Sequence, residues 1–388
     1  MTQTDGRARL TIFFLWITGI FAAGQFAKVA VAFPLFRALY PGLGPKLGFL
    51  ISALSVMGLV FGLFAGMILS RYGFRKLLML ALGLGGALSL FQASQPAFGL
   101  MLASRVLEGA SHLMIVVAAP TLIGQIAPPR FRNTAMALWS TVFAVAFAVF
   151  SWLGLPLAER FGLPVLLMVH GGLLWTMALI LSRRLPPVVR REPVAALRLR
   201  EIMAKHVTAY SSPAIAAPAA GWLFYAMAFV ALVTVFPDFV SMDQRGVISG
   251  VMPLAALSVS MTLGITLLRF VSPIAVLVSG FSIAAILALC LGLGGGQAWI
   301  AVAMIASLGF VQAGSFASIP VLNATHEDQS LANGALAQTG NAGNLIGTPL
   351  LLWLVERFGL SGLVGFACVV FCSGALVHLG LARLRRRL

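Results

Sequence analysis

Three charged side chains lie inside long apolar stretches of this 388-residue chain, where a charge is costly unless it is paired or functional. They are Lys28, Arg105 and Glu108. Gln25 precedes Lys28 by three residues, and His112 follows Glu108 by four. Residues three or four apart share one face of a helix. The spacing therefore predicts one polar face with Gln25 and Lys28, and another with Arg105, Glu108 and His112.

These charges suggest two kinds of chemistry, the binding of a charged solute and the transfer of a proton. At a rise of about 1.5 Å per residue they fall in one layer, just outside the middle of their helices. They sum to +1, which an anionic or zwitterionic solute would balance. Glu108 is the only acidic residue in that layer, so we expect it to carry a proton, with Arg105 beside it. Histidine has a reference pKa of about 6.5, so His112 is a second candidate carrier.

Simpler interpretations of the same residues stay open. Lys28, Arg105 and Glu108 could form a network that only joins helices. His112 fits a hydrogen-bonded packing residue equally well. His170 and His378 are isolated in apolar stretches, and we interpret both as structural.

The composition requires lipid as the solvent. Only 9% of the residues are charged and 60% are apolar, whereas soluble domains carry about 25% charged residues. A spanning helix needs about 20 mostly apolar residues. Such stretches predict twelve transmembrane helices, at 11–33, 46–69, 76–94, 98–125, 133–157, 163–182, 213–236, 246–268, 273–293, 297–322, 331–355 and 360–381.

The basic residues predict the orientation. If the N-terminus is cytoplasmic, the cytoplasmic segments hold 19 Lys and Arg residues and the external segments hold five. Cytoplasmic loops are enriched in such residues, so both termini are expected in the cytoplasm. The net charge of +16 comes from these short loops, and no nucleic-acid partner is expected. We also read the N-terminus as a first helix and not as a removable signal.

The sequence repeats itself at about half its length. The segment 157–163 (LAERFGL) recurs at 354–360 (LVERFGL), an offset of 197 residues. We therefore expect two pseudo-symmetric six-helix bundles in parallel orientation. The predicted domains are residues 1–182, a basic cytoplasmic linker at 183–212 that could lie on the membrane surface, and residues 213–388.

Twelve helices in two halves with a basic central loop resemble the major facilitator superfamily of secondary transporters. Helix 4 reads Arg105-Val106-Leu107-Glu108-Gly109, similar to the family's R-x-x-x-G motif, whose buried arginine is often linked to proton coupling. The loop after helix 2 is similar to the family signature G-x-L-a-D-R-x-G-R-K/R, except that serine replaces aspartate, which weakens a charge-based latch. The matching positions form an expected cytoplasmic gate motif: Gly66, Ser70, Arg71, Gly73, Arg75 and Lys76.

The resemblance also selects candidate binding residues, because helices 1, 4, 7 and 10 line the central cavity in this family. It implies substrate contacts from Lys28, Gln25 and Arg105 in the first half. In the second half it implies contacts from Trp222 and Tyr225 of helix 7 and Gln312 of helix 10. No charge is expected in the membrane layer of the second half.

A polar stripe on helix 11 has two possible interpretations. Gln338, Asn341 and Asn344 are spaced by three residues among glycines. They could line the cavity or hold neighbouring helices together by hydrogen bonds.

These observations predict a secondary active transporter that works by alternating access. We expect a small organic solute, anionic or zwitterionic, and proton coupling. The alternatives are an uncoupled uniporter or exchanger, a proton-driven efflux pump for amphiphilic compounds and, remotely, a membrane sensor. We expect no enzyme, cofactor or metal site, and a monomer in a bacterial-type inner membrane. The three cysteines fit apolar packing, at Cys290, Cys368 and Cys372.

Overall fold

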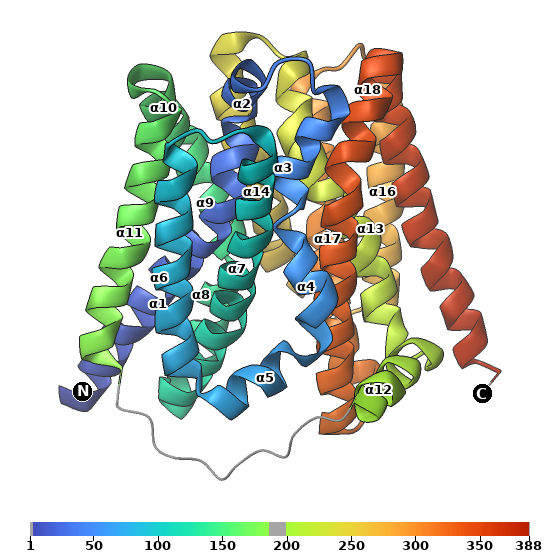
Figure 1. Cartoon of the computed structure of the whole chain (residues 1–388). Coiled ribbons are helices and arrows are strands. Elements are labelled where there is room, and N and C mark those ends of the chain that lie inside the picture. The colour runs from blue at the N-terminus through green and yellow to red at the C-terminus, as the bar shows by residue number, and fades with distance from the viewer. Residues whose placement is uncertain (1–2, 186–198, 388) are drawn as a thin grey trace. The chain divides into compact units, whose positions relative to one another are not determined.

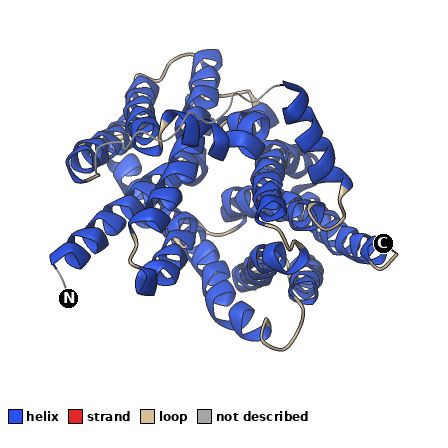
Figure 2. Ribbon diagram, turned by 90° about the horizontal axis from the view of Figure 1, so that it is seen from below, coloured by secondary structure: helices blue, strands red, loops and turns tan. Residues whose placement is uncertain are grey.

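The computed structural model describes residues 3–185 and 199–387, and every regular element in these ranges is a helix (Figure 2). Within this described part, ten helices are long and apolar enough to cross a membrane. A bent pair, Gly44–Ser52 and Ser55–Phe64, meets at 56° and would make an eleventh span. The prediction of an all-α protein with many apolar membrane-crossing helices is confirmed at this level.

The chain divides into two compact units, Met1–Phe36 with Phe64–Ala195, and Arg37–Leu63 with Ala196–Leu388. Residues 37–63 thus group with the second unit, whereas the sequence placed them in the first half. Part of the predicted linker, residues 186–198, lies outside the described residues. The rest of the predicted linker includes the end of α11 (Leu163–Arg184) and the helix α12 (Leu199–Ser211), which Figure 1 labels.

The first unit is built from nine labelled helices and short irregular turns. They are α1 (Gln3–Val31), the start of α2 (Phe33–Leu39), α5 (Ala65–Tyr72), α6 (Phe74–Ala93), α7 (Phe98–Ile126), α8 (Arg132–Ser140), α9 (Val142–Val149), α10 (Leu155–Phe161) and α11 (Leu163–Arg184), with a π-helical turn at Phe150–Gly154.

The second unit contains the broken second span and the C-terminal helices. They are α3 (Phe49–Ser52), α4 (Ser55–Phe61), α12 (Leu199–Ser211), α13 (Ala216–Val235), α14 (Met242–Val259), α15 (Ile265–Leu267), α16 (Pro273–Leu293), α17 (Ala298–Leu322) and α18 (His326–Arg385), with a π-helical turn at Ser260–Gly264.

Glycines with positive φ angles end helices where the sequence predicted turns. Gly73 (φ 89°) separates α5 from α6, and Gly162 (φ 90°) separates α10 from α11. Gly359 (φ 57°) interrupts α18 inside its 60 residues. An unbroken helix of that length would extend about 90 Å, roughly three times the hydrocarbon layer. Gly162 and Gly359 occupy equivalent positions of the repeated segment, so both copies break the chain in the same way.

The second predicted span is not one continuous helix. Ala53 and Leu54 separate α3 from α4 in a turn. There the amide of Val56 donates to the carbonyl of Ala53, three residues back, at 3.1 Å. Bonds of this kind tighten the turn relative to an α-helix. The prediction of an uninterrupted helix at 46–69 was therefore wrong in this detail.

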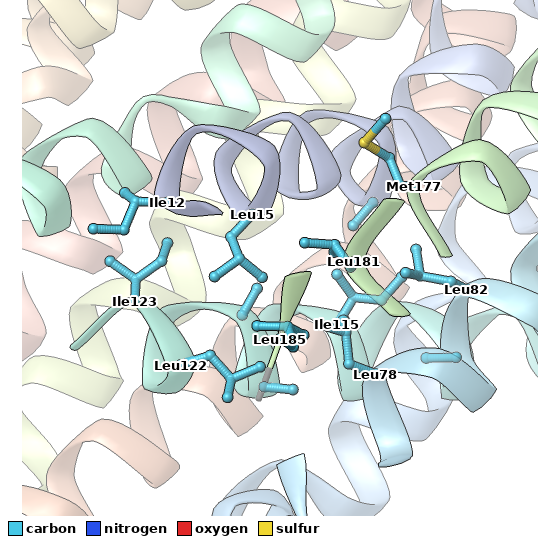
Figure 3. Packing of buried hydrophobic residues seen from close by; sticks show 14 of the residues in the cluster. Ile12, Leu15, Leu78, Leu82, Ile115, Leu122, Ile123, Met177, Leu181 and Leu185 are labelled. Atoms are coloured by element: carbon cyan, nitrogen blue, oxygen red, sulfur yellow. The ribbon is translucent and has the colours of Figure 1, made fainter. Parts of the chain in front are cut away.

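A cluster of buried apolar side chains lies inside the first unit, most of them from α1, α6, α7 and α11 (Figure 3). Its members include Ile12 and Leu15 of α1, Leu82 of α6, Ile115 of α7 and Leu181 of α11. Because lipid tails are as apolar as leucine, close packing and hydrogen bonds, more than the hydrophobic effect, hold helices together in a membrane. This packing fixes α1, α6, α7 and α11 around the polar residues described next.

Candidate transport site

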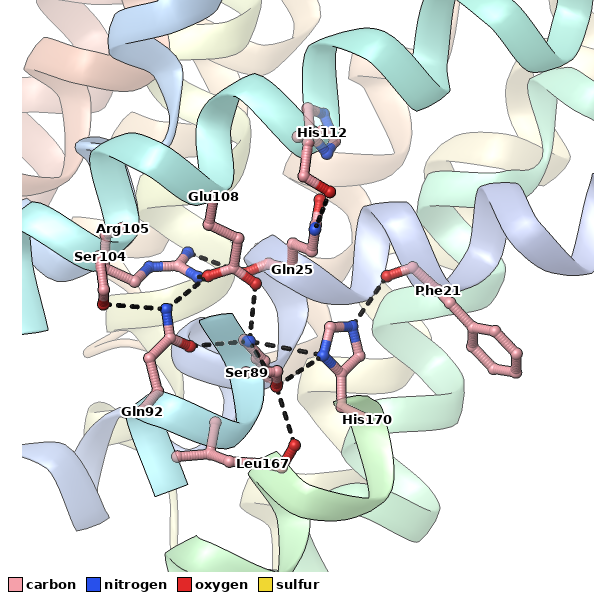
Figure 4. A network of polar contacts seen from close by, with 12 residues as sticks. Phe21, Gln25, Ser89, Gln92, Ser104, Arg105, Glu108, His112, Leu167 and His170 are labelled. Carbon is pink, nitrogen blue, oxygen red and sulfur yellow. Dashed lines mark hydrogen bonds and ion pairs between the residues drawn. The ribbon is translucent and has the colours of Figure 1, made fainter. Parts of the chain in front are cut away.

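Four helices of the first unit bring polar side chains together in its interior (Figure 4). Among the described residues, the only fully buried charged side chains are Lys28, Arg105 and Glu108, each with 0% exposure. They come from α1 and α7, as the sequence predicted, and all three join one network. The helices α6 and α11 complete it with three further buried residues, Ser89, Gln92 and His170.

Lys28 is the centre of this network. Its Nζ lies 2.7 Å from Oε1 of Glu108, 2.9 Å from Oε1 of Gln92 and 3.0 Å from Oγ of Ser89. Nδ1 of His170 is a fourth neighbour at 3.4 Å. An ammonium group has three protons to donate, so every donor of Lys28 is engaged in this conformation.

Glu108 accepts hydrogen bonds on both carboxylate oxygens. Oε1 accepts from Lys28, and Oε2 accepts from Nε2 of Gln92 at 2.7 Å and from Nη1 of Arg105. Arg105 also donates from Nη2 to the backbone carbonyl of Gln25 at 2.7 Å. Two cations on one anion leave a formal charge of +1, and charge-assisted bonds join α1 to α7.

The hydrogen-bond partners of His170 determine which ring nitrogen carries the proton. Nε2 lies 3.0 Å from the carbonyl oxygen of Phe21, which can only accept, so Nε2 is protonated. Nδ1 faces the ammonium of Lys28, which can only donate, so Nδ1 carries a lone pair. The hydroxyl proton of Ser89 has two acceptors, this Nδ1 at 3.0 Å and the carbonyl of Leu167 at 2.8 Å. His170 is therefore neutral and orients Lys28.

Gln25 and His112 lie beside the charged residues. Nε2 of Gln25 donates to Oγ of Ser111 at 3.0 Å, while its buried Oε1 has no hydrogen-bond partner among the described residues. His112 is 7% exposed and donates from Nδ1 to the carbonyl of Ala22 at 3.0 Å. A Cβ added at Gly85 would lie 2.5 Å from the Ser111 hydroxyl oxygen, so only glycine leaves room for this arrangement.

The sequence found the charges but missed their neutral partners Ser89 and Gln92. It also did not single out Ser104, which accepts from Nε2 of Gln92 at 3.2 Å, and it gave His170 a structural role without a link to Lys28. One signal was available, because Ser89 and Gln92 are three residues apart in an otherwise apolar helix and so share a face. His378 is also buried, and neither of its ring nitrogens has a partner among the described residues.

The candidate residues of the second unit form an aromatic row with one weak polar contact. The rings of Trp222 and Tyr225 on α13 stack with centroids 4.3 Å apart, and Phe229 continues the stack at 5.3 Å. Phe316 of α17 meets Trp222 edge-on at 5.0 Å. The hydroxyl of Tyr225 lies 3.5 Å from Oε1 of Gln312, at the limit of a hydrogen bond.

The polar stripe of Gln338, Asn341 and Asn344 lies on α18 and makes contacts between helices. Gln338 donates to the carbonyl of Leu59 in α4 at 2.7 Å. Asn341 donates to the carbonyl of Ala337 and packs where Gly58 of α4 leaves space. These contacts match the interhelical interpretation of Gln338 and Asn341, while Oδ1 of Asn344 is buried without a partner among the described residues.

The predicted gate motif surrounds the turn between α5 and α6. Gly73 supplies the positive φ angle, and Nη2 of Arg75 donates to the carbonyl of Ser182 near the end of α11 at 2.7 Å. The dipole of α11 favours a cation at that end. The side chain of Ser70 lies outside the described part of the structure. The remaining positions are exposed, at Gly66, Arg71 and Lys76.

Comparison with known proteins gives two matches. The sequence model of the family described as Major Facilitator Superfamily matches residues 15–326. A protein named "Multidrug resistance protein 2" from Bacillus subtilis (strain 168) is 27% identical over 148 residues. That match covers 36% of this chain and 35% of the relative.

Proposed function

This chain belongs to the Major Facilitator Superfamily of membrane transporters, and we propose that it is a secondary active transporter of a small organic solute, coupled to protons. Its many apolar helices make it an integral membrane protein. The coupling, the solute class and the alternating-access mechanism are the parts that we propose. The buried contact between Lys28 and Glu108 is the observation that carries them.

The proposed architecture has twelve spans in two six-helix halves, residues 1–182 and 213–388, with both termini in the cytoplasm of a bacterial-type inner membrane. The ten apolar helices, the bent pair at Gly44–Phe64 and the interruption of α18 at Gly359 support this count. The excess of basic residues in alternate loops supports the orientation.

The single fully buried acid among the described residues, Glu108, supports proton coupling. A protonated Glu108 could no longer offset the charges of Lys28 and Arg105, so both ion pairs would be lost in one step. Breaking a buried pair by removing one partner costs about 3–5 kcal/mol. Lys28 and Arg105 both hold α1 against α7, so the loss would favour a different packing of these helices. The occupancy of one proton site is thereby linked to a change in conformation.

The excess charge of the network favours an anionic or zwitterionic solute. Lys28 has all its donors engaged while Glu108 is ionised, so it would become available for a carboxylate only after Glu108 is protonated. Proton and anion would then bind together, as symport requires. An uncoupled uniporter or exchanger would instead use Lys28 and Arg105 as a permanent anion clamp.

A second candidate function is proton-driven efflux of amphiphilic aromatic compounds. The half-buried ring of Trp222, stacked on the buried rings of Tyr225 and Phe229, offers flat apolar surface near the polar side chain of Gln312. Aromatic rings of this kind stack on flat solutes and attract organic cations. The partial similarity to a protein named for multidrug resistance favours this candidate as well.

A ligand-stabilisation screen on the purified protein separates these candidates. Small carboxylates, amino acids and aromatic organic cations would each be tested for their effect on the melting temperature at two pH values. The leading proposal predicts stabilisation by carboxylates or amino acids, strongest at the lower pH and absent in Lys28→Ala. Stabilisation by aromatic cations alone, retained in Lys28→Ala and lost in Trp222→Ala, would support the efflux candidate instead.

A further inference from the structure

One side chain of the second unit, Gln338 on α18, connects three separate elements. Its Nε2 donates to the carbonyl of Leu59 near the end of α4 at 2.7 Å. Its Oε1 accepts from the hydroxyl of Tyr210 on α12 at 2.7 Å. The same Nε2 lies 3.3 Å from Nε2 of His206, one turn earlier on α12. The helix α12 begins at Leu199 and belongs to the predicted linker.

Two glycines bring α4 and α18 close enough for this contact. A Cβ added at Gly62 would lie 3.3 Å from the backbone of Gln338, and one at Gly334 would lie 2.9 Å from the carbonyl oxygen of Leu63. The carbonyl of Leu59 belongs to the last turn of α4, where helical donors run out. Gln338 therefore caps the end of α4 while it holds α12.

The partners determine every proton in this contact. The Leu59 carbonyl can only accept, so the nitrogen of Gln338 faces α4 and its oxygen faces the Tyr210 hydroxyl. Nδ1 of His206 lies 3.1 Å from the carbonyl of Ile202, so Nδ1 is protonated. Nε2 of His206 then carries a lone pair and accepts from Gln338. This contact needs a neutral imidazole.

A second proton on His206 would place an N–H against the amide nitrogen of Gln338. Reversing the amide would restore that contact, and the Tyr210 hydroxyl could turn to accept, but the bond to Leu59 would be lost and two carbonyl oxygens would face each other. No orientation of Gln338 satisfies all three partners once His206 is charged. We propose that Gln338, His206 and Tyr210 form a latch that holds α12 on α4 and α18, and that protonation of His206 releases it.

The charged and titratable groups near His206 lie on α12 and α18. On its own helix Tyr210 stacks at 6.4 Å, and Lys205 pairs with Glu327 of α18 at 3.3 Å. The first turn of α18 also contains His326 and Asp328. Neither α4 nor α13, the other helices in contact, contains a charged residue. Histidine is the side chain whose ordinary titration falls between about pH 5 and 8.

The consequence for transport rests on the proposed function and orientation. The latch joins the last turn of α4 to the part of α18 about three turns after its start, on the side of the membrane that the proposed orientation places toward the cytoplasm. A neutral His206 would hold these parts of α4 and α18 together, and an acidic cytoplasm would release α12 and ease their separation. The latch would thus regulate opening toward the cytoplasm, independently of the proton site at Glu108.

Spin labelling of the purified full-length protein tests the latch without any solute. A nitroxide is attached at Met203→Cys, an exposed position of α12 outside the latch, after replacement of the three native cysteines. The mobile fraction should rise about tenfold between about pH 7.5 and 5.5, as expected for the loss of one to two hydrogen bonds. His206→Gln, which can still accept but does not titrate, should abolish the response. His326→Gln, the matched control on α18, should retain it.

A wild-type spectrum that does not change with pH would overturn the proposal. So would a pH response that survives in His206→Gln or disappears in His326→Gln. Tyr210→Phe provides an independent check if His206→Gln does not fold, because it should raise the mobile fraction at both pH values. None of these measurements uses transport, so a failure of the proposed function would leave their outcome unaffected.

Discussion

Nζ of Lys28 lies 2.7 Å from Oε1 of Glu108, and the two side chains, 80 residues apart in sequence, are both fully buried. Arg105 reaches the other carboxylate oxygen of the same residue. Three charges thus meet in one unit of a membrane protein, with a cation in excess. Substitutions of these buried residues should therefore differ in their effect on stability.

The buried charges should respond unequally to neutral substitutions. Glu108→Gln leaves two cations without an anion and should lower the free energy of unfolding by about 3–5 kcal/mol. Lys28→Met leaves the balanced pair of Arg105 and Glu108 and should be less damaging. Thermal unfolding of the purified variants measures the difference. An equal or larger loss in Lys28→Met would show that the charge balance does not govern stability here.

His170 should stabilise the protein by orienting Lys28. His170→Phe removes the acceptor for Lys28 and the donor to the Phe21 carbonyl. Lys28 keeps three other acceptors, so the loss of these two buried contacts should cost about 1–3 kcal/mol in total. If His170 acts through Lys28, the loss should shrink in the Lys28→Met background, and a double-mutant cycle reports the coupling. Additive losses would mean that His170 does not act through Lys28.

Gly85 should be intolerant of any side chain. In Gly85→Ala the new Cβ would lie 2.5 Å from the Ser111 oxygen and 2.8 Å from Nε2 of Gln25, so the polar contacts must shift. We expect destabilisation of about 1–3 kcal/mol. Gly83 lies on the same helix with open space at its Cβ position, so Gly83→Ala is the matched control. That variant should be neutral or slightly stabilised, and equal melting temperatures for the two would contradict the proposed crowding.

The sequence predicted the charged half of the candidate site better than its neutral half. Lys28, Arg105 and Glu108 were detectable because a charge in an apolar stretch is rare. Ser89 and Gln92 carry no charge, and His170 is alone on its helix. Their connection to Lys28 depends on how α1, α6 and α11 pack. The spacing of polar residues along one helix does not reveal that packing.

Helix breaks were predictable where a residue type causes them. Gly162 and Gly359 lie between predicted spans, in the two copies of the repeated segment, and both have positive φ angles. The break at Ala53 and Leu54 has no proline or glycine to mark it, and it was missed. The grouping of residues 37–63 with the second unit was also missed, because it follows from tertiary contacts such as Gly58 against Asn341.

Proton movement in reconstituted vesicles tests proton coupling through Glu108 most directly. The solute that stabilises the protein best is applied as a gradient, and a pH indicator inside the vesicles reports proton entry. We predict solute-driven acidification with the wild-type protein and none with Glu108→Gln, which should still exchange solute at equal concentrations. Solute-driven acidification with Glu108→Gln that equals the wild-type acidification would contradict proton coupling through Glu108.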